Sequence, residues 1–226
     1  MLSDPAGRQR LIAGAAERPP TYDLGAIYPM PAGDARYEFS PTESLAAEAG
    51  RRGVSPAEAF IDLTLEQGGR TLFLWPFLND DVAAVEEMLR NPLTVLGLAD
   101  AGAHVGQIMD ASQPTWFLGH WVRDRGLSDL GPAVSRLTSI PAQLFGIADR
   151  GTLTPGAFAD VNVFDLAALR LPQPEYVHDF PTGAGRFIQR AEGYHYTVVN
   201  GEVFMEDGEH AGALAGRTMR SGAATG

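Results

Sequence analysis

Apolar and polar positions alternate in blocks along the first two thirds of the chain, and the blocks have the lengths of helices and strands. Ser55-Pro56-Ala57-Glu58 has the order of an N-cap, a first-turn proline and an acidic third position, and predicts a helix that ends at Gly68-Gly69. The apolar runs 71–77 and 94–99 predict strands buried on both faces, as in a parallel sheet. Further helices are predicted over 4–16, from 82 to about 90, over 115–125, and from Pro132, with Pro141 interrupting or restarting the last one.

The pattern changes at Arg150. Residues 151–156 form a cluster of turn residues, and 159–165 are β-branched with partial alternation. Asn200-Gly201 separates two β-rich runs within 194–205, and this dipeptide strongly predicts a hairpin. We therefore expect an irregular Pro/Gly-rich surface segment over 1–42, an α/β part over 43–150, a small β-domain over 151–210 and a flexible tail over 211–226.

Composition excludes several classes of function. The net charge of the 226 residues is −11, which argues against a nucleic-acid partner and against an anionic membrane surface. The chain has no cysteine, so disulfides, thiol nucleophiles and thiolate metal ligands are absent. No apolar run is long enough to cross a membrane, and the first residues lack the order of a signal peptide, so we expect a cytoplasmic protein.

Two phrases in the last third of the chain resemble a known family. The first, residues 150–165 (RGTLTPGAFADVNVFD), resembles the entry into the small β-domain of the amidohydrolase superfamily. The second, residues 198–203 (VVNGEV) followed by Asp207-Gly208, resembles the closing hairpin of that domain. The segment 96–105, LGLADAGAHV, resembles the last barrel strand of one branch, the N-acyl-D-amino-acid deacylases. Other segments similar to that branch are Asp110-Ala111-Ser112, 119–125, 186–193 and 208–210, so that the resemblance extends from about Tyr28 to Arg220.

The resemblance implies a (β/α)8 barrel with a β-sandwich. A complete barrel takes roughly 250 residues, and the α/β part of this chain has fewer. We therefore expect an α/β fold that corresponds to the C-terminal part of a TIM-like barrel, over 43–150, followed by a small β-sandwich-type domain.

Asp100 is the principal candidate for chemistry, because it follows the predicted strand 94–99 at the end where α/β proteins build their sites. From residue type alone, a carboxylate that caps a turn is the more common case. The resemblance implies instead that Asp100 is the general base that takes a proton from a metal-bound water and returns it to the leaving nitrogen. His104 is expected to contact substrate or orient Asp100, or to be a loop histidine bonded to backbone. Asn79 is expected to contact substrate or to cap the helix that follows it.

The other candidates have more ordinary explanations. Trp121 and Arg123 lie on a predicted helix; Trp121 is expected in the core, and Arg123 is expected to be solvated or ion-paired. Asp160 and Asp165 flank a predicted strand and are expected to bond turn backbone. The remaining histidines in the last third of the chain are expected on the surface: His178, His195 and His210.

The resemblance implies zinc, but the family's first-strand His-x-His motif and its mid-barrel ligands have no counterparts here, so no metal ligand is predicted in this chain. Two functions follow. The first is a metal-dependent hydrolase of linear, non-peptide amide bonds whose substrates are N-acyl amino acids. The alternative is a non-catalytic truncated fragment, or a C-terminal subunit that completes a barrel with another chain. Exposed barrel strands would then favour a partner chain or self-association.

Overall fold

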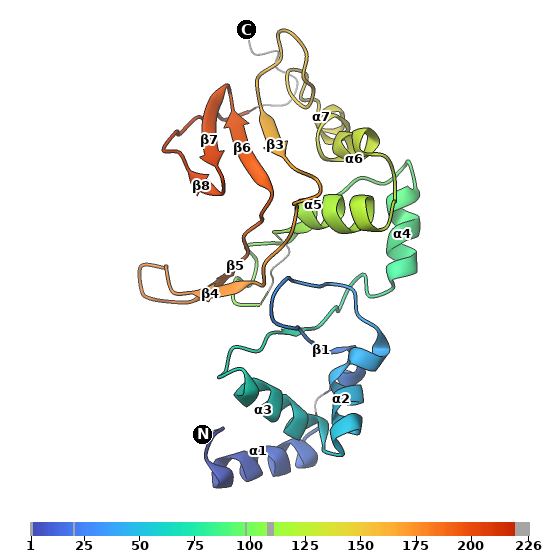
Figure 1. Ribbon diagram of the computed structural model, residues 1–226, viewed down its shortest axis with the longest axis vertical. Coiled ribbons are helices and arrows are strands. Elements are labelled where there is room, and N and C mark those ends of the chain that lie inside the picture. The colour runs from blue at the N-terminus through green and yellow to red at the C-terminus, as the bar shows by residue number, and fades with distance from the viewer. Residues whose placement is uncertain (1, 20, 98, 108–110, 220–226) are drawn as a thin grey trace. The chain divides into compact units, whose positions relative to one another are not determined.

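The computed structural model describes residues 2–19, 21–97, 99–107 and 111–219. The chain divides into two compact units, residues 1–84 and 85–226 (Figure 1). The first unit has helices and one two-stranded sheet, the second has helices and two sheets, and the fold is mixed α/β.

The first unit is built mainly from helices. Asp4 and Ser55 cap two of them: the Asp4 carboxylate accepts from the Gly7 N–H at 2.8 Å, and the Ser55 hydroxyl accepts from the Glu58 N–H at 3.2 Å. The second cap confirms the predicted helix start. The elements are α1 (Pro5–Glu17), η1 (Leu24–Ala26), β1 (Tyr28–Pro29), η2 (Pro41–Glu43), α2 (Leu45–Arg52), α3 (Pro56–Glu66) and β2 (Phe73–Leu74).

The core of this unit lies between α2, α3 and the segment that precedes them. Leu45, Ala49 and Ala59 are buried there with Ile27, and Phe73 packs against this cluster. Ile27 belongs to the segment predicted to lie on the surface, as do the buried Met30 and Ala35. That expectation is wrong for these residues: Ile27, between η1 and β1, packs into the cluster with α2 and α3, and Met30 and Ala35 are buried just after β1.

The predicted strand over 71–77 is largely wrong. Only Phe73–Leu74 form a strand, and β2 pairs antiparallel with β1 through Tyr28↔Leu74 and Pro29↔Phe73. The next apolar residues are exposed: Trp75 is 48% exposed and Phe77 62%. The second predicted strand, 94–99, is also wrong where the structure describes it, because residues 94–97 and 99 have no strand structure; Leu98 lies outside the described residues.

Helix α4 (Val82–Arg90) crosses the boundary between the units, and the second unit continues with four more helical elements. The predicted helix is confirmed, but its cap is Asp81, which accepts from the N–H groups of Ala83 and Ala84, and not Asn79. A break at Thr138 separates the last two helices. Pro141 then lies in the first turn of the second, where its ring no longer meets a carbonyl in the preceding turn. The elements are α5 (Gln113–Trp116), the π-helix η3 (Phe117–Asp124) that continues it, α6 (Leu130–Leu137) and α7 (Ser139–Leu144).

The last third of the chain is β-rich, as predicted. Asn200 and Gly201 have φ values of 50° and 83°, which are those of the tight turn that joins two twisted strands, and the predicted hairpin is confirmed. An antiparallel sheet has the order β3-β6-β7-β8, and β4 pairs separately with β5. The strands are β3 (Val161–Phe164), β4 (Glu175–Val177), β5 (Arg186–Ile188), β6 (Tyr194–Val199), β7 (Glu202–Glu206) and β8 (Glu209–His210).

Candidate functional site

Asp100 lies in a loop of successive turns that covers residues 100–107. Asp100 and His104 have positive φ values of 54° and 49°, and Gly102 has 96°. The turns are closed by two backbone hydrogen bonds: the Ala103 N–H donates to the Asp100 carbonyl at 3.2 Å, and the Gln107 N–H donates to the His104 carbonyl at 2.7 Å. Left-handed backbone at non-glycine residues is uncommon and concentrates at functional sites.

The side chains of Asp100 and His104 are exposed. Among the described residues, neither side chain makes a hydrogen bond or an ion pair. An exposed carboxylate can exchange a proton with a water molecule or a bound substrate, but nothing around it holds it in one orientation. No group of three or more His, Asp or Glu side chains that could hold a metal ion occurs within residues 2–19, 21–97, 99–107 and 111–219.

Asn79, the second predicted substrate contact, belongs to the first unit, whereas Asp100 and His104 belong to the second. Asn79 is exposed, has φ 56° and does not cap α4, since Asp81 fills that role. Its part in a site stays a prediction. Asp110, part of one segment that resembles the deacylases, lies outside the described residues, and so does Arg220.

The loop is attached to the hairpin β4–β5 by one backbone hydrogen bond. The Phe187 N–H donates to the Val105 carbonyl at 2.9 Å. Tyr176 of β4 lies against the same place, because a Cβ built on Gly106 would be 3.9 Å from its phenol oxygen. The sequence analysis did not single out this hairpin. The turn-rich stretch 181–185, Pro-Thr-Gly-Ala-Gly, between two short β-rich runs was the pattern that could have indicated it.

A second polar cluster surrounds Arg150. Its guanidinium bonds the Asp160 carboxylate and the Asn200 side-chain oxygen, and lies 4.3 Å from the centroid of the Phe158 ring. The Asp160 carboxylate also accepts from the Asn200 N–H at 2.8 Å. Burial acts to raise the pKa of Asp160, but these hydrogen bonds outweigh it and hold the pKa below its usual range. Asp160 therefore bonds turn backbone, as predicted.

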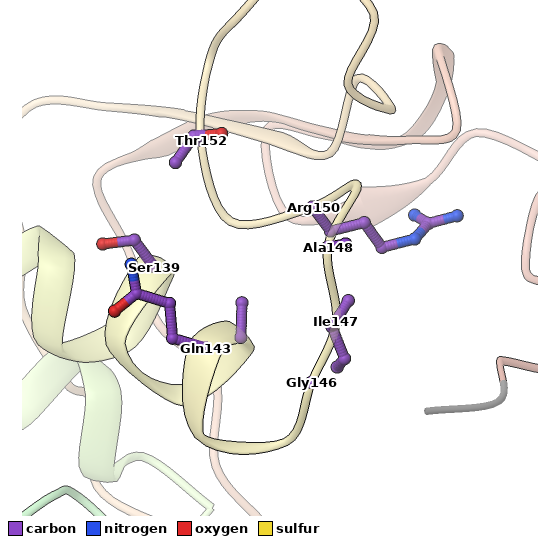
Figure 2. Close-up of a pocket in the computed structure, with 8 residues that line it drawn as sticks. Ser139, Gln143, Gly146, Ile147, Ala148, Arg150 and Thr152 are labelled. Atoms are coloured by element: carbon purple, nitrogen blue, oxygen red, sulfur yellow. The ribbon is translucent and has the colours of Figure 1, made fainter. Parts of the chain in front are cut away.

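A cavity of about 270 Å³ lies beside this cluster. Figure 2 shows that the guanidinium of Arg150 points away from the cavity, whereas Ser139 and Gln143 on α7 border it. The lining holds no carboxylate or imidazole, so it offers no group for acid–base catalysis. The lining residues are Ser139, Ala142, Gln143, Gly146, Ile147, Ala148, Arg150 and Thr152.

The helix η3 carries the remaining candidates. Trp121 is buried, 7% exposed, as predicted for a core position. His120 stacks on Trp116 at a centroid distance of 4.1 Å. Arg123 pairs with Asp124 and donates to the carbonyls of Leu166 and Leu169, which ties the helix to the connection after β3. The histidines at 178, 195 and 210 are exposed, as predicted, and Asp165 accepts from the Ala167 N–H.

Residues 4–205 match the model of a family described as the amidohydrolase family. The chain belongs to the amidohydrolase family. This match covers most of the chain and confirms the resemblance found in the β-domain phrases.

Relatives of the predicted branch match parts of the chain. D-aminoacylase of Alcaligenes xylosoxydans xylosoxydans is 39% identical over 105 residues, which are 45% of this chain and 20% of the relative. N-acyl-D-glutamate deacylase of the same organism is 53% identical over 51 residues, 23% of this chain and 10% of the relative. A crystal structure of D-aminoacylase overlaps 84% of this chain and 37% of its own, with 25% identity and a TM-score of 0.48. The matched parts thus span a fifth or less of the two curated relatives.

Within the described residues, no helix combines the length and the apolar character that crossing a membrane requires.

Proposed function

We propose that this chain takes part in the hydrolysis of the amide bond of N-acyl amino acids, with Asp100 as the group that moves the proton. The single observation that carries the proposal is the placement of Asp100: an exposed carboxylate at a left-handed position, in a segment that resembles the deacylases, within a chain of the amidohydrolase family. The names of the matched relatives, D-aminoacylase and N-acyl-D-glutamate deacylase, support the substrate class.

The chemistry assigned to Asp100 is general base and then general acid catalysis. The ionised carboxylate accepts a proton from the attacking water, and the resulting carboxylic acid gives it to the amide nitrogen as the C–N bond breaks. One residue serves both steps because the proton that it takes is the proton that the leaving amine needs. His104, four residues further along the same turns, is proposed to contact the substrate, and Asn79 is proposed as a second contact.

Zinc, the metal that the resemblance implies, does not fit the described residues on their own. Neutral imidazole and carboxylate sites need three or four ligands around one point, and the described ranges contain no group of even three. Asp100 and His104 are both exposed and would be two ligands at most. We therefore propose no zinc site within them, and the proton transfers of Asp100 do not depend on which group activates the water.

We also propose that residues 43–150 and 151–210 correspond to the last part of a (β/α)8 barrel and to a small β-domain, with 1–42 and 211–226 as flanking segments. The exposed residues that follow β2 are proposed to meet a second copy of the chain. Tyr22, Trp75 and Phe77 form an aromatic cluster there, with centroid distances of 5.4 Å from Trp75 to Tyr22 and 5.7 Å to Phe77.

The direct test is the release of free amino acid from N-acetyl-D- and N-acetyl-L-amino acids, with and without added zinc. Asp100→Asn keeps the size of the side chain and removes the base, so we expect activity to fall by about a hundredfold or more. Asp129→Asn is the matched control, because Asp129 precedes α6, is exposed and makes no side-chain cap bond. Turnover by Asp100→Asn at the wild-type rate, or no turnover of any of these substrates by the wild-type chain, would contradict the proposal.

A further inference from the structure

The hairpin β4–β5 lies against the Asp100 loop and has no part in the function proposed above. We propose that Tyr176 is a positioning residue, which holds this loop on the free edge of β5. The inference rests on the proposed role of Asp100 for its catalytic meaning. The contact between Tyr176 and the loop does not depend on that role, and a separate measurement tests it.

The strand register explains why β5 can bind the loop. Glu175 pairs with Ile188 and Val177 with Arg186, so that Phe187 faces Tyr176 between these pairs. In an antiparallel pair, successive N–H groups point alternately toward the partner strand and away from it. The Phe187 N–H is the one that points away from β4, and it donates to the Val105 carbonyl at 2.9 Å.

The ring of Tyr176 fixes the geometry of this edge. Its centroid is 5.0 Å from that of Phe187, with the two rings almost perpendicular at 75°. The ring also lies directly over Gly185, where an added Cβ would be only 2.7 Å from the phenol oxygen. The same oxygen is 3.9 Å from the position that a Cβ on Gly106 of the loop would take. Tyr176 therefore contacts Phe187 and lies near one residue on each chain segment that the Phe187–Val105 hydrogen bond joins, namely Gly185 and Gly106.

The remaining backbone hydrogen bonds within 100–107 are local. Ala103 donates to Asp100 and Gln107 to His104, and both bonds only close turns. For the described residues of the loop, the Phe187–Val105 bond is the one that joins it to another element. Val105 directly follows His104, so a shift of this attachment moves the turns that carry both proposed functional side chains.

The structure predicts two independent ways of disturbing the attachment. Tyr176→Ala removes the ring. Gly185→Ala leaves residue 176 a tyrosine but displaces its ring by a steric clash. Tyr176→Phe keeps the ring and removes only the hydroxyl. Thr182→Ala is the control within the same hairpin connection, since Thr182 is exposed and lies outside the paired residues of β4 and β5.

The experiment is amide hydrogen exchange on the full-length chain, measured at the Phe187 N–H and on the peptide 99–107. We expect exchange at Phe187 to quicken about tenfold or more in Tyr176→Ala and Gly185→Ala, and to stay within about twofold of wild type in Tyr176→Phe and Thr182→Ala. Circular dichroism checks that each variant is folded. Wild-type exchange at Phe187 in a folded Tyr176→Ala chain would overturn the inference.

The catalytic arm separates this inference from the proposed function. In the amide-hydrolysis assay we expect Tyr176→Ala to lower kcat through Asp100 and to raise KM through His104, and Tyr176→Phe to restore both. Absence of hydrolysis in the wild type contradicts the proposed function, while the exchange rates still decide whether Tyr176 holds the loop. Faster exchange with unchanged kcat overturns the positioning role.

Discussion

The carboxylate of Asp160 accepts a hydrogen bond from the backbone N–H of Asn200 at 2.8 Å, although the two residues are 40 positions apart. Arg150 bonds both side chains, and its own side chain is only 12% exposed. The Asn200 amide in turn donates to the carbonyl of Ala215, which is buried. Arg150 thus joins the segment before β3 to the turn between β6 and β7, and Asn200 joins that turn to the chain that follows β8.

Asp160→Asn is expected to lower the free energy of unfolding by about 1 kcal/mol near pH 7, because it removes the charge from a partly exposed, hydrogen-bonded pair. The pKa of Asp160 lies below its ordinary value of 3.8, so its contribution is present above about pH 4 and is lost as the pH falls through the lower, folded-state pKa. The difference between wild type and variant should therefore shrink in acid. Urea unfolding at a series of pH values measures it.

Asp129→Asn provides the control for that series, because Asp129 makes no side-chain cap bond. Its effect on stability should be small, because the substitution breaks no side-chain cap bond. A stability difference for Asp160→Asn that grows toward low pH would contradict the assignment of the ionised carboxylate to this network.

Alanine substitutions at Gly151 and Gly156 separate the stability cost of backbone strain from the stability cost of steric crowding. Both have positive φ, 84° and 93°. A Cβ at Gly151 would lie 2.9 Å from the Cβ of Ala142 and from the Thr138 carbonyl oxygen, whereas nothing is within 4 Å at Gly156. Alanine at 156 should cost about 1 kcal/mol from strain alone, and alanine at 151 about 1–3 kcal/mol more, because the neighbours are backbone and a short side chain. Equal losses in thermal unfolding would show that helix α7 moves to make room.

Arg123 is expected to be sensitive to replacement by lysine. Its Nη1 donates to the Leu169 carbonyl at 2.6 Å and to the Leu166 carbonyl at 3.1 Å, while Nε and Nη2 bond Asp124. A lysine ammonium cannot present this planar set of donors, so Arg123→Lys should lower the free energy of unfolding by about 1–2 kcal/mol. Asp124→Asn should cost less, since it leaves both carbonyl contacts intact. A larger loss for Asp124→Asn in chemical denaturation would show that the ion pair matters more.

The sequence predicted those elements whose determinants are local. Ser55 with Glu58 marks a helix start, and Asn200-Gly201 marks a hairpin turn, because cap and turn geometry depend on a few adjacent residues. The sequence also predicted the family, through the phrase 150–165, which combines turn glycines with Asp160. In the structure, Asp160 accepts a hydrogen bond from the Asn200 N–H and so joins two turns.

The two predicted barrel strands failed because a strand needs partners that the pattern does not contain. The run 71–77 is as apolar as a buried strand, but only Phe73 and Leu74 find a partner, and it is the antiparallel β1. Residues 94–97 form no ladder. Asp100 stays a prediction as the catalytic candidate, and the sequence around it does not show that its loop is bonded to Phe187 and lies near Tyr176. Those residues are more than 70 positions away, beyond the reach of any local pattern.

The apolar residues after β2 lead to a last prediction, on self-association. Phe77 is 62% exposed and Leu78 71% exposed, and Trp75 packs between Tyr22 and Phe77. Contiguous exposed apolar surface of this kind favours association with a second copy. The double variant Phe77→Ser with Leu78→Ser should therefore shift the chain toward monomer in sedimentation velocity at a fixed concentration. Leu93→Ser is the matched control, since Leu93 is 91% exposed and lies outside this aromatic cluster. If the control shifts the distribution as much as the double variant, or if the wild-type chain is already monomeric at high concentration, these residues do not mediate contact between copies.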